Sequence, residues 1–204
     1  MTAKELCAVG VAVSVLGTIT AASAYPPAVG ILGASKSCNS CHVNNGPWTD
    51  ESKTIVDIID KGTGRSLRQK DGSFLIEAKR FESKTVITII GRAKEDTLSG
   101  PYRNAWLYID PAQIGTTSLS KFPPGWSVDL PMACRLVGDK SHVYEGARVT
   151  VLPMTVQPLD GAEAATLDIH VMLTSGESVK GDATKGMLSN YLVRTVRLTV
   201  IDAK

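Results

Sequence analysis

The sequence predicts a mainly β protein, an antiparallel β-sandwich with immunoglobulin-like connectivity. After Gly72, short runs rich in Val, Ile, Thr and aromatic residues are separated by Gly, Pro, Asp and Asn, which are typical of turns. Several runs alternate apolar and polar residues, as a strand with one buried face does. Many short strands joined by turns favour two packed sheets.

Eight segments are expected to be strands. They span residues 74–80, 84–92, 104–110, 126–130, 133–137, 147–156, 165–174 and 191–200. Between 167 and 173 the odd-numbered residues are apolar, whereas Asp168, His170 and Met172 face the other way. Asp-Gly pairs at 71–72 and 160–161 provide turns.

The residues before these strands predict one short helix. Asp50 and the two residues after it offer capping groups, and Gly62 is a typical stop. The residues that give this helix an apolar side are Ile55, Val56, Ile58 and Ile59. The expected organisation is a segment at 25–70 with this helix, packed as one domain with a sandwich at 71–204.

The N-terminus predicts export. Residues 1–24 contain Lys4, an apolar stretch at 6–20 and the small-x-small ending Ala22-Ser23-Ala24, which together indicate a signal peptide. An uncleaved membrane anchor is the alternative. We expect a periplasmic or extracellular protein with no transmembrane anchor after cleavage. The net charge of +2 gives no indication of a nucleic-acid partner.

Cysteine usage points to a covalently held cofactor. Cys7 leaves with the signal peptide, and the three remaining cysteines cannot all pair as a disulfide scaffold. Cys38, Cys41 and His42 form Cys-x-x-Cys-His, the attachment pattern for c-type haem. Two thiols three positions apart lie on one side of a helical turn, where each can bond a haem vinyl group, and the histidine can bind the iron.

Two other interpretations of the cysteine pair remain open. A thioredoxin-like redox pair would follow a strand and begin a helix, whereas Pro- and Gly-rich sequence precedes Cys38. A structural zinc site needs a fourth ligand, and the next histidine, His142, lies far along the chain near the lone Cys134. We expect Cys134 to be a buried small hydrophobe or a cross-link between two chains.

Through Cys38, Cys41 and His42 the chain resembles the c-type cytochrome family. The resemblance implies one covalently bound haem c, His42 as the proximal iron ligand, and redox partner proteins. The start expected after cleavage, Tyr25-Pro26-Pro27, also resembles cytochrome f. That likeness implies that the α-amino group of Tyr25 is the sixth iron ligand.

Other candidates for the sixth ligand come from the residues themselves. Met132 and Met154 each follow Leu-Pro, and a thioether raises the reduction potential relative to a nitrogen ligand. His170 and His142 carry imidazoles. Met172 and Met187 have less in their favour, and an open site also remains possible.

The leading hypothesis is an exported monohaem cytochrome that transfers single electrons between protein partners and is not an enzyme. The alternative is a haem enzyme or gas-binding sensor with an open sixth coordination site. A third hypothesis is an exported adhesion or assembly module without haem. Trp48, Trp106 and Trp126 shield the haem or fill the core. Arg194 and Arg197 form a docking surface or a solvated strand face.

Overall fold

The structure is a computed structural model that describes residues 36–40, 42–115, 121–176 and 185–201. Strands dominate these ranges. The helical elements within them are short 3-10 helices: η2 (Cys38–Ser40), η3 (Glu51–Lys53) and η4 (Pro111–Gln113). The prediction of a mainly β protein is confirmed. No helix in the described ranges has the length and hydropathy needed to cross a membrane.

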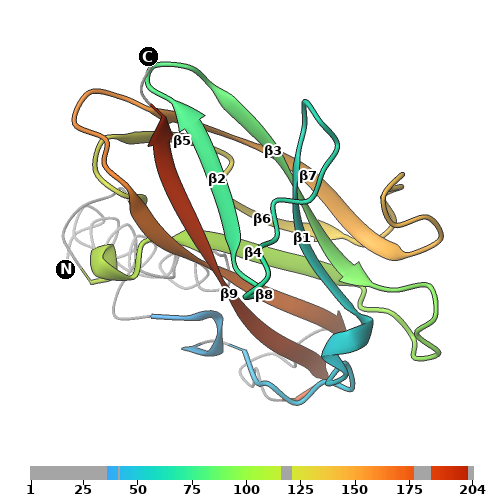
Figure 1. The fold of residues 1–204 in the computed structure, drawn as a ribbon. Coiled ribbons are helices and arrows are strands. Elements are labelled where there is room, and N and C mark those ends of the chain that lie inside the picture. Colours follow the sequence, from blue (N-terminus) through green and yellow to red (C-terminus); the bar gives the residue numbers. More distant parts are fainter. Residues whose placement is uncertain (1–35, 41, 116–120, 177–184, 202–204) are drawn as a thin grey trace, which may run out of the picture.

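Two sheets pack face to face (Figure 1). One has the strand order β1-β3-β7-β5 and the other β2-β9-β8-β4-β6. The strands are β1 (Thr54–Asp60), β2 (Phe74–Lys79), β3 (Lys84–Arg92), β4 (Arg103–Ile109), β5 (Trp126–Asp129), β6 (Met132–Leu136), β7 (Arg148–Pro158), β8 (Ala165–Gly176) and β9 (Met187–Ile201). All eight predicted strands are among them. In an immunoglobulin-like sandwich, β1, β3, β7 and β5 would correspond to strands A, B, E and D, and β9, β8 and β4 to G, F and C.

The prediction of a helix after Asp50 is wrong. The Asp50 carboxylate does accept a hydrogen bond from the Ser52 N–H at 2.9 Å, but only the single turn η3 follows. Residues 54–60 form β1, because its β-branched side chains favour an extended chain and pack on both faces of the strand. The sequence predicted that the sandwich begins at residue 71, but it begins at Thr54.

One strand pair departs from the antiparallel prediction. β2 runs parallel to β9, from Phe74 opposite Val196 to Lys79 opposite Ile201. After β1 the chain crosses from the four-stranded to the five-stranded sheet, so β2 does not form a hairpin with the strand before it. The other strand pairs are antiparallel.

The core lies between the two sheets. The apolar face predicted for 165–174 is confirmed, because Leu167, Ile169, Val171 and Leu173 of β8 are fully buried in it. Three tryptophans belong to the same core: Trp48, Trp106 and Trp126. Trp126 donates its indole N–H to the Glu163 carbonyl at 2.9 Å. Core packing therefore accounts for all three tryptophans.

Candidate functional site

The Cys-x-x-Cys-His motif begins in a helical turn. The Ser40 N–H donates to the Ser37 carbonyl at 3.1 Å, and the His42 N–H donates to the Cys38 carbonyl at 3.0 Å. The second bond has the spacing of an α-helical turn, so Cys38 and His42 lie at the two ends of one turn. Asn39 and Ser40 are exposed. Cys41 lies outside the described residues.

The chain just after the motif docks on the first part of β9. The Asn44 carboxamide oxygen accepts from the Tyr191 N–H at 3.0 Å, and that of Asn45 accepts from the Ser189 N–H at 3.1 Å. The Asn45 side chain also donates to the Met187 carbonyl at 3.3 Å, and the Gly46 N–H donates to the Ser189 carbonyl at 2.7 Å. Side-chain amides thus satisfy backbone groups of β9 that an adjacent strand would otherwise bond.

Gly46 permits this close approach. A Cβ at position 46 would lie 2.3 Å from the Asn190 carboxamide oxygen and 2.9 Å from the Ser189 carbonyl. The second contact is with backbone, which cannot rotate away as a side chain can. A larger residue at position 46 would therefore push the motif segment off β9.

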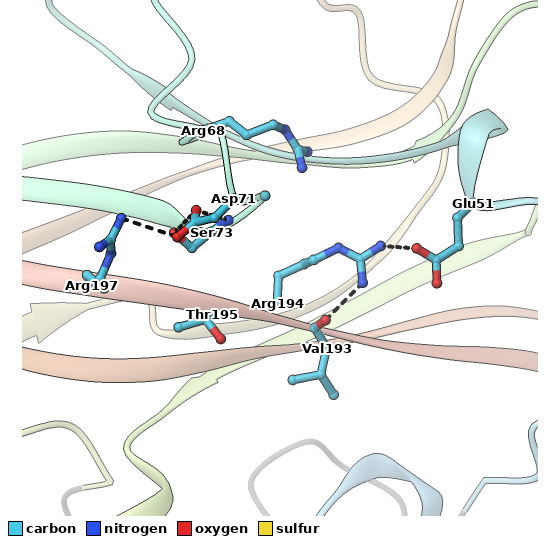
Figure 2. Close-up of a pocket in the computed structure, with 9 residues that line it drawn as sticks. Glu51, Arg68, Asp71, Ser73, Val193, Arg194, Thr195 and Arg197 are labelled. Atoms are coloured by element: carbon cyan, nitrogen blue, oxygen red, sulfur yellow. Dashed lines mark hydrogen bonds and ion pairs between the residues drawn. The ribbon is translucent and has the colours of Figure 1, made fainter.

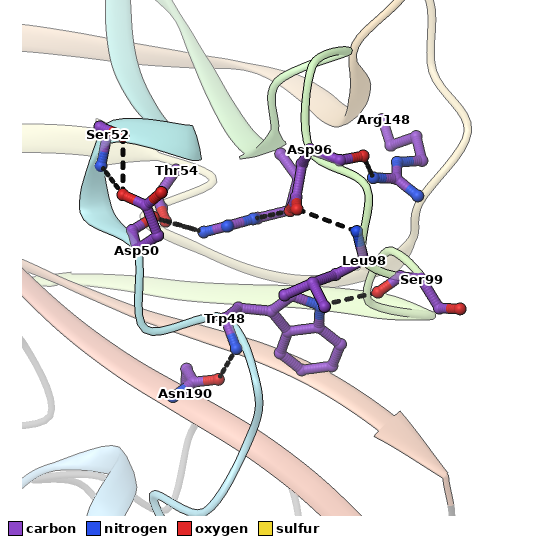
Figure 3. Close-up of polar contacts among 10 residues, drawn as sticks. Trp48, Asp50, Ser52, Thr54, Asp96, Leu98, Ser99, Arg148 and Asn190 are labelled. Carbon is purple, nitrogen blue, oxygen red and sulfur yellow. Dashed lines mark hydrogen bonds and ion pairs between the residues drawn. The ribbon is translucent and has the colours of Figure 1, made fainter.

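Trp48 anchors the end of the same segment (Figure 3). Its backbone N–H donates to the buried Asn190 carboxamide oxygen at 2.8 Å, and its indole N–H donates to the Ser99 carbonyl at 2.8 Å. The side chain is 2% exposed. Trp48 therefore ties the motif segment to β9, to the loop after β3 and to the core at once.

A buried arginine fixes the chain beyond Trp48. Arg92 is fully buried, and it pairs with Asp96 at 2.6 Å and donates to the Asp50 carbonyl at 2.9 Å. It also contacts the Thr54 hydroxyl. Burial is the largest single effect and alone would raise the pKa of Asp96, but the hydrogen bonds from Arg92 and the Leu98 N–H, together with the charges of Arg92 and Arg148, hold this pKa below its usual value. The charged pair thus connects the start of β1 to the loop after β3 (Figure 3).

The outer face of the five-stranded sheet, which we call the donor face, collects several of the predicted site residues. Strand register places them in rows across the sheet. One row is Cys134, Ala105, Met172 and Tyr191, and the next is Met132, Leu107, His170 and Val193. Leu107, His170 and Met172 are at most 5% exposed although they point away from the core between the sheets. Thioethers, an imidazole and a phenol therefore share one face.

A polar link joins the donor face to the motif. The Tyr191 hydroxyl and His170 Nδ1 lie 2.8 Å apart. Burial first, and the nearby Cys38 thiol second, raise the pKa of Tyr191 to about 12, and a hydrogen bond with Ser37 opposes them. Burial lowers the pKa of His170, against the opposing charge of Asp168. Both side chains are therefore neutral at physiological pH.

Burial also lowers the pKa of His42. A neutral imidazole is the form that has a lone pair for a metal. Burial of the motif therefore favours the neutral imidazole of His42.

The predicted sixth-ligand candidates are scattered. Met154 is 1% exposed in the core between the sheets, on the opposite side of the five-stranded sheet from the motif. His142 is exposed in the loop between β6 and β7. Met132 lies on β6, three strands from β9 and so about 14 Å across the sheet. His170 is joined to Tyr191, and Tyr25 lies outside the described residues.

Met187, which had little in its favour from the sequence, is the methionine that meets the motif. Its sulfur lies 3.2 Å from His42 Nδ1, although the two residues are 145 positions apart in the chain. Sequence spacing carries no signal of such a contact. Asn44 and Asn45 were also missed, and the Asn-Asn-Gly run after His42 was the available signal because these residues bond backbone groups locally.

The residues present fit a haem. Cys38, His42 and Met187 supply a thiol, an imidazole and a thioether, the donor types that c-type haems use. The donor face beside them is largely apolar. The buried Ser189 hydroxyl, on the same side of β9 as Met187, meets no hydrogen-bond partner among the described residues. No group of three His, Cys, Asp or Glu side chains that could hold a metal occurs in these ranges.

The arginines predicted for a docking surface are paired. Arg194 bonds Glu51 at 2.6 Å, and Arg197 lies 3.7 Å from Asp71. Both line a pocket of about 580 Å³ with Arg68 (Figure 2). Both guanidinium groups are therefore paired with carboxylates of the same chain.

The prediction that Cys134 is buried is wrong. Its strand, β6, lies at the edge of the five-stranded sheet, and Cys134 is exposed there. An edge strand has a neighbour on only one side, which leaves its side chains more open to solvent.

No protein-family model matches the chain, and no curated protein matches it.

Proposed function

We propose that this chain is an exported monohaem c-type cytochrome that passes single electrons between protein partners. The observation that carries the proposal is the helical turn from Cys38 to His42, docked beside a buried sheet face that presents soft donor atoms. When bound, the haem supplies a one-electron couple at its iron.

Different residues of the chain would have different roles in holding the haem. The thiols of Cys38 and Cys41 would each add across a vinyl double bond, the sulfur to one carbon and the hydrogen to the other, so that no oxidant is needed. His42 would bind the iron through its neutral imidazole. The segment 44–48 holds the turn on β9, and the donor face would exclude water from one side of a bound porphyrin.

The position of the turn favours electron transfer with other proteins. Asn39 and Ser40 lie between the attachment positions and are exposed, so a porphyrin bonded there would have an edge near the surface. A partner could then approach it without opening the sandwich.

Covalent attachment is the test. The chain is expressed in a bacterium with a c-type haem maturation system, purified and denatured, and then stained for haem and weighed by mass spectrometry. The expected mass is that of the chain plus one haem, and Cys38→Ala/Cys41→Ala should remove both signals. Cys134→Ala is the matched control because it removes a cysteine outside the motif. A colourless wild-type protein with the mass of its bare chain would refute the proposal.

Export has its own test. The protein recovered from the periplasm or medium should begin at Tyr25. Recovery of the full-length chain from the membrane fraction would instead support the uncleaved anchor.

A further inference from the structure

A gap interrupts the edge of β9 that faces away from β8. β2 pairs with β9 only from Val196 onward, and the docked Asn44 and Asn45 side chains reach β9 only as far as Tyr191. Residues 192–195 therefore have β8 on one side and no described strand on the other. The pocket of about 580 Å³ lies at this gap, because residues of β9 and of the turn before β2 line it (Figure 2).

The gap leaves two backbone N–H groups without partners. Ser189 and Tyr191 direct their N–H groups toward the motif segment. Alternate residues of a strand direct these groups to the same side, and the register of β9 with β8 is unbroken, so Val193 and Thr195 direct theirs into the gap. Neither group has a hydrogen-bond partner among the described residues. Exposed N–H groups at a sheet edge are suited to an anion.

Two arginines of the pocket have N–H donors to spare. Arg68 donates to the Val56 carbonyl and lies over the Phe74 ring, and it forms no ion pair with a carboxylate of the described chain. Arg197 lies 3.7 Å from Asp71, which is longer than a hydrogen bond. Each guanidinium group carries five N–H donors, so most of those on both arginines are available to a ligand.

The carboxylates of the pocket do not cancel its positive charge. Arg68, Arg194 and Arg197 face Glu51 and Asp71, which leaves a net charge of +1 (3 − 2) on the lining. The Glu51 and Asp71 side chains are 64% and 63% exposed, and ion pairs so open to water are weak. A ligand anion can therefore compete with Glu51 for Arg194.

We propose that this pocket binds a small ligand through an oxyanionic group, a carboxylate or a phosphate. Arg68 and Arg197 hold its oxygens through charge-assisted hydrogen bonds, and the N–H groups of Val193 and Thr195 complete the site. A pocket of about 580 Å³ is in the size range of small-molecule sites, so the anion is one end of a larger ligand.

The rest of the lining favours a ligand with hydroxyl groups. The carboxylates of Glu51 and Asp71 accept hydrogen bonds, and the exposed Thr195 hydroxyl both donates and accepts them. A sugar acid or a sugar phosphate combines hydroxyl groups with an oxyanion. It is the class of ligand that suits both parts of the pocket.

The test is a titration of the purified protein at constant ionic strength with glucuronate, glucose 6-phosphate, inorganic phosphate and neutral glucose. Calorimetry and amide NMR measure binding. At least one sugar anion should bind saturably, more tightly than phosphate or glucose, and should shift the Val193 and Thr195 amide signals. Equal affinity for inorganic phosphate would show an adventitious ion only and would overturn the proposed ligand class. The absence of saturable binding by both sugar anions would overturn the site itself.

Variants locate the binding in the pocket. Arg68→Gln and Arg197→Gln should each raise the Kd of the sugar anion by about tenfold or more, because each removes a charge-assisted hydrogen bond. Glu51→Gln should lower the Kd, since it removes the carboxylate that competes for Arg194. Arg103→Gln, on β4, is the matched control and should leave the Kd unchanged. An unchanged Kd in Arg68→Gln and Arg197→Gln, with unfolding curves like that of the wild type, would refute the site.

This site does not depend on the proposed haem. None of its residues belongs to the Cys-x-x-Cys-His motif, and binding is measured without reference to colour or redox state. A protein that lacks covalent haem but binds the sugar anion would refute the proposed function alone. A haem-bearing protein that binds neither sugar anion would refute this inference alone.

Discussion

The two sheets bury their outer faces with different side chains. On the four-stranded sheet the cluster is aliphatic and is formed by Ile55, Ile59, Ile89 and Val149. The loop between β6 and β7 covers it through Tyr144, whose hydroxyl donates to Asp57 at 2.6 Å. On the five-stranded sheet the donor face presents thioethers, an imidazole and a phenol.

This difference separates two reasons for burying a face. A face that packs only against its own chain needs volume and shape, which β-branched residues provide with little loss of side-chain entropy. Met and His add a polarisable sulfur and an imidazole that packing alone does not need. Under the proposed function, the donor face is the side that meets the haem, and substitutions on the two faces should have different effects.

The largest effect is expected where the motif segment joins the core. Trp48→Ala should lower the free energy of unfolding by about 3–5 kcal/mol, because it removes a buried side chain and the indole bond to Ser99. It should also disturb the haem spectrum. Urea denaturation and visible absorption measure the two effects. Trp48→Phe is the control for the hydrogen bond, and an unchanged spectrum in Trp48→Ala would show that docking is independent of Trp48.

A matched pair of substitutions tests the two faces directly. Ile89→Ala should lower the free energy of unfolding by about 2–5 kcal/mol and leave the haem spectrum unchanged, because Ile89 packs under the covering loop. Met172→Leu should change stability by less than about 1.5 kcal/mol but shift the haem absorption. If Ile89→Ala shifts the haem absorption and Met172→Leu does not, the proposed difference between the two faces is wrong.

Close approach at Gly46 gives a smaller effect. Gly46→Ala should lower the free energy of unfolding by about 1–3 kcal/mol, since its Cβ would meet the Ser189 carbonyl at 2.9 Å. Hydrogen exchange at the Ser189 and Tyr191 amides should become faster. Gly62→Ala, in an exposed turn, is the control. Equal exchange in both variants would mean that the segment tolerates the added methyl group.

The smallest effect is a pH dependence from His170. Burial lowers its pKa in the folded protein, whereas the unfolded chain takes up a proton near pH 6.5. The stability that neutral His170 contributes is therefore complete above about pH 6.5 and is lost as the pH falls toward the folded-state pKa. Lowering the pH from roughly 7.5 to 5.5 should reduce the free energy of unfolding of the wild-type protein more than that of His170→Gln. Urea denaturation at each pH measures this difference. Parallel curves would show that His170 is not the group responsible.

The sandwich was largely predictable because its strands are marked locally. Alternation and turn residues identified all eight strands after Gly72, including the buried face of β8. The segment 54–60 was misread because Asp50 and Gly62 resemble helix caps, while burial on both faces removes the alternation that marks a strand. The parallel pairing of β2 was missed because it depends on where the chain crosses between sheets.

Only the short-range part of the candidate site is marked in the sequence. Cys38, Cys41 and His42 form a short Cys-x-x-Cys-His motif, and haem attachment to it stays a prediction. The contact with Met187 depends on a register that links residues more than a hundred positions apart. No local pattern encodes such a register, because the whole sandwich must form before β9 meets the motif segment.

The docked segment also protects a strand edge. β2 pairs with β9 only from Val196 onward, so the earlier part of β9 has β8 on one side and the side chains of Asn44 and Asn45 on the other. Before that segment docks, a newly made chain presents unpaired amide and carbonyl groups there, and a second molecule could add to them. Chains that leave the docked state would therefore be prone to self-association, so docking of the motif segment would also protect the protein from aggregation.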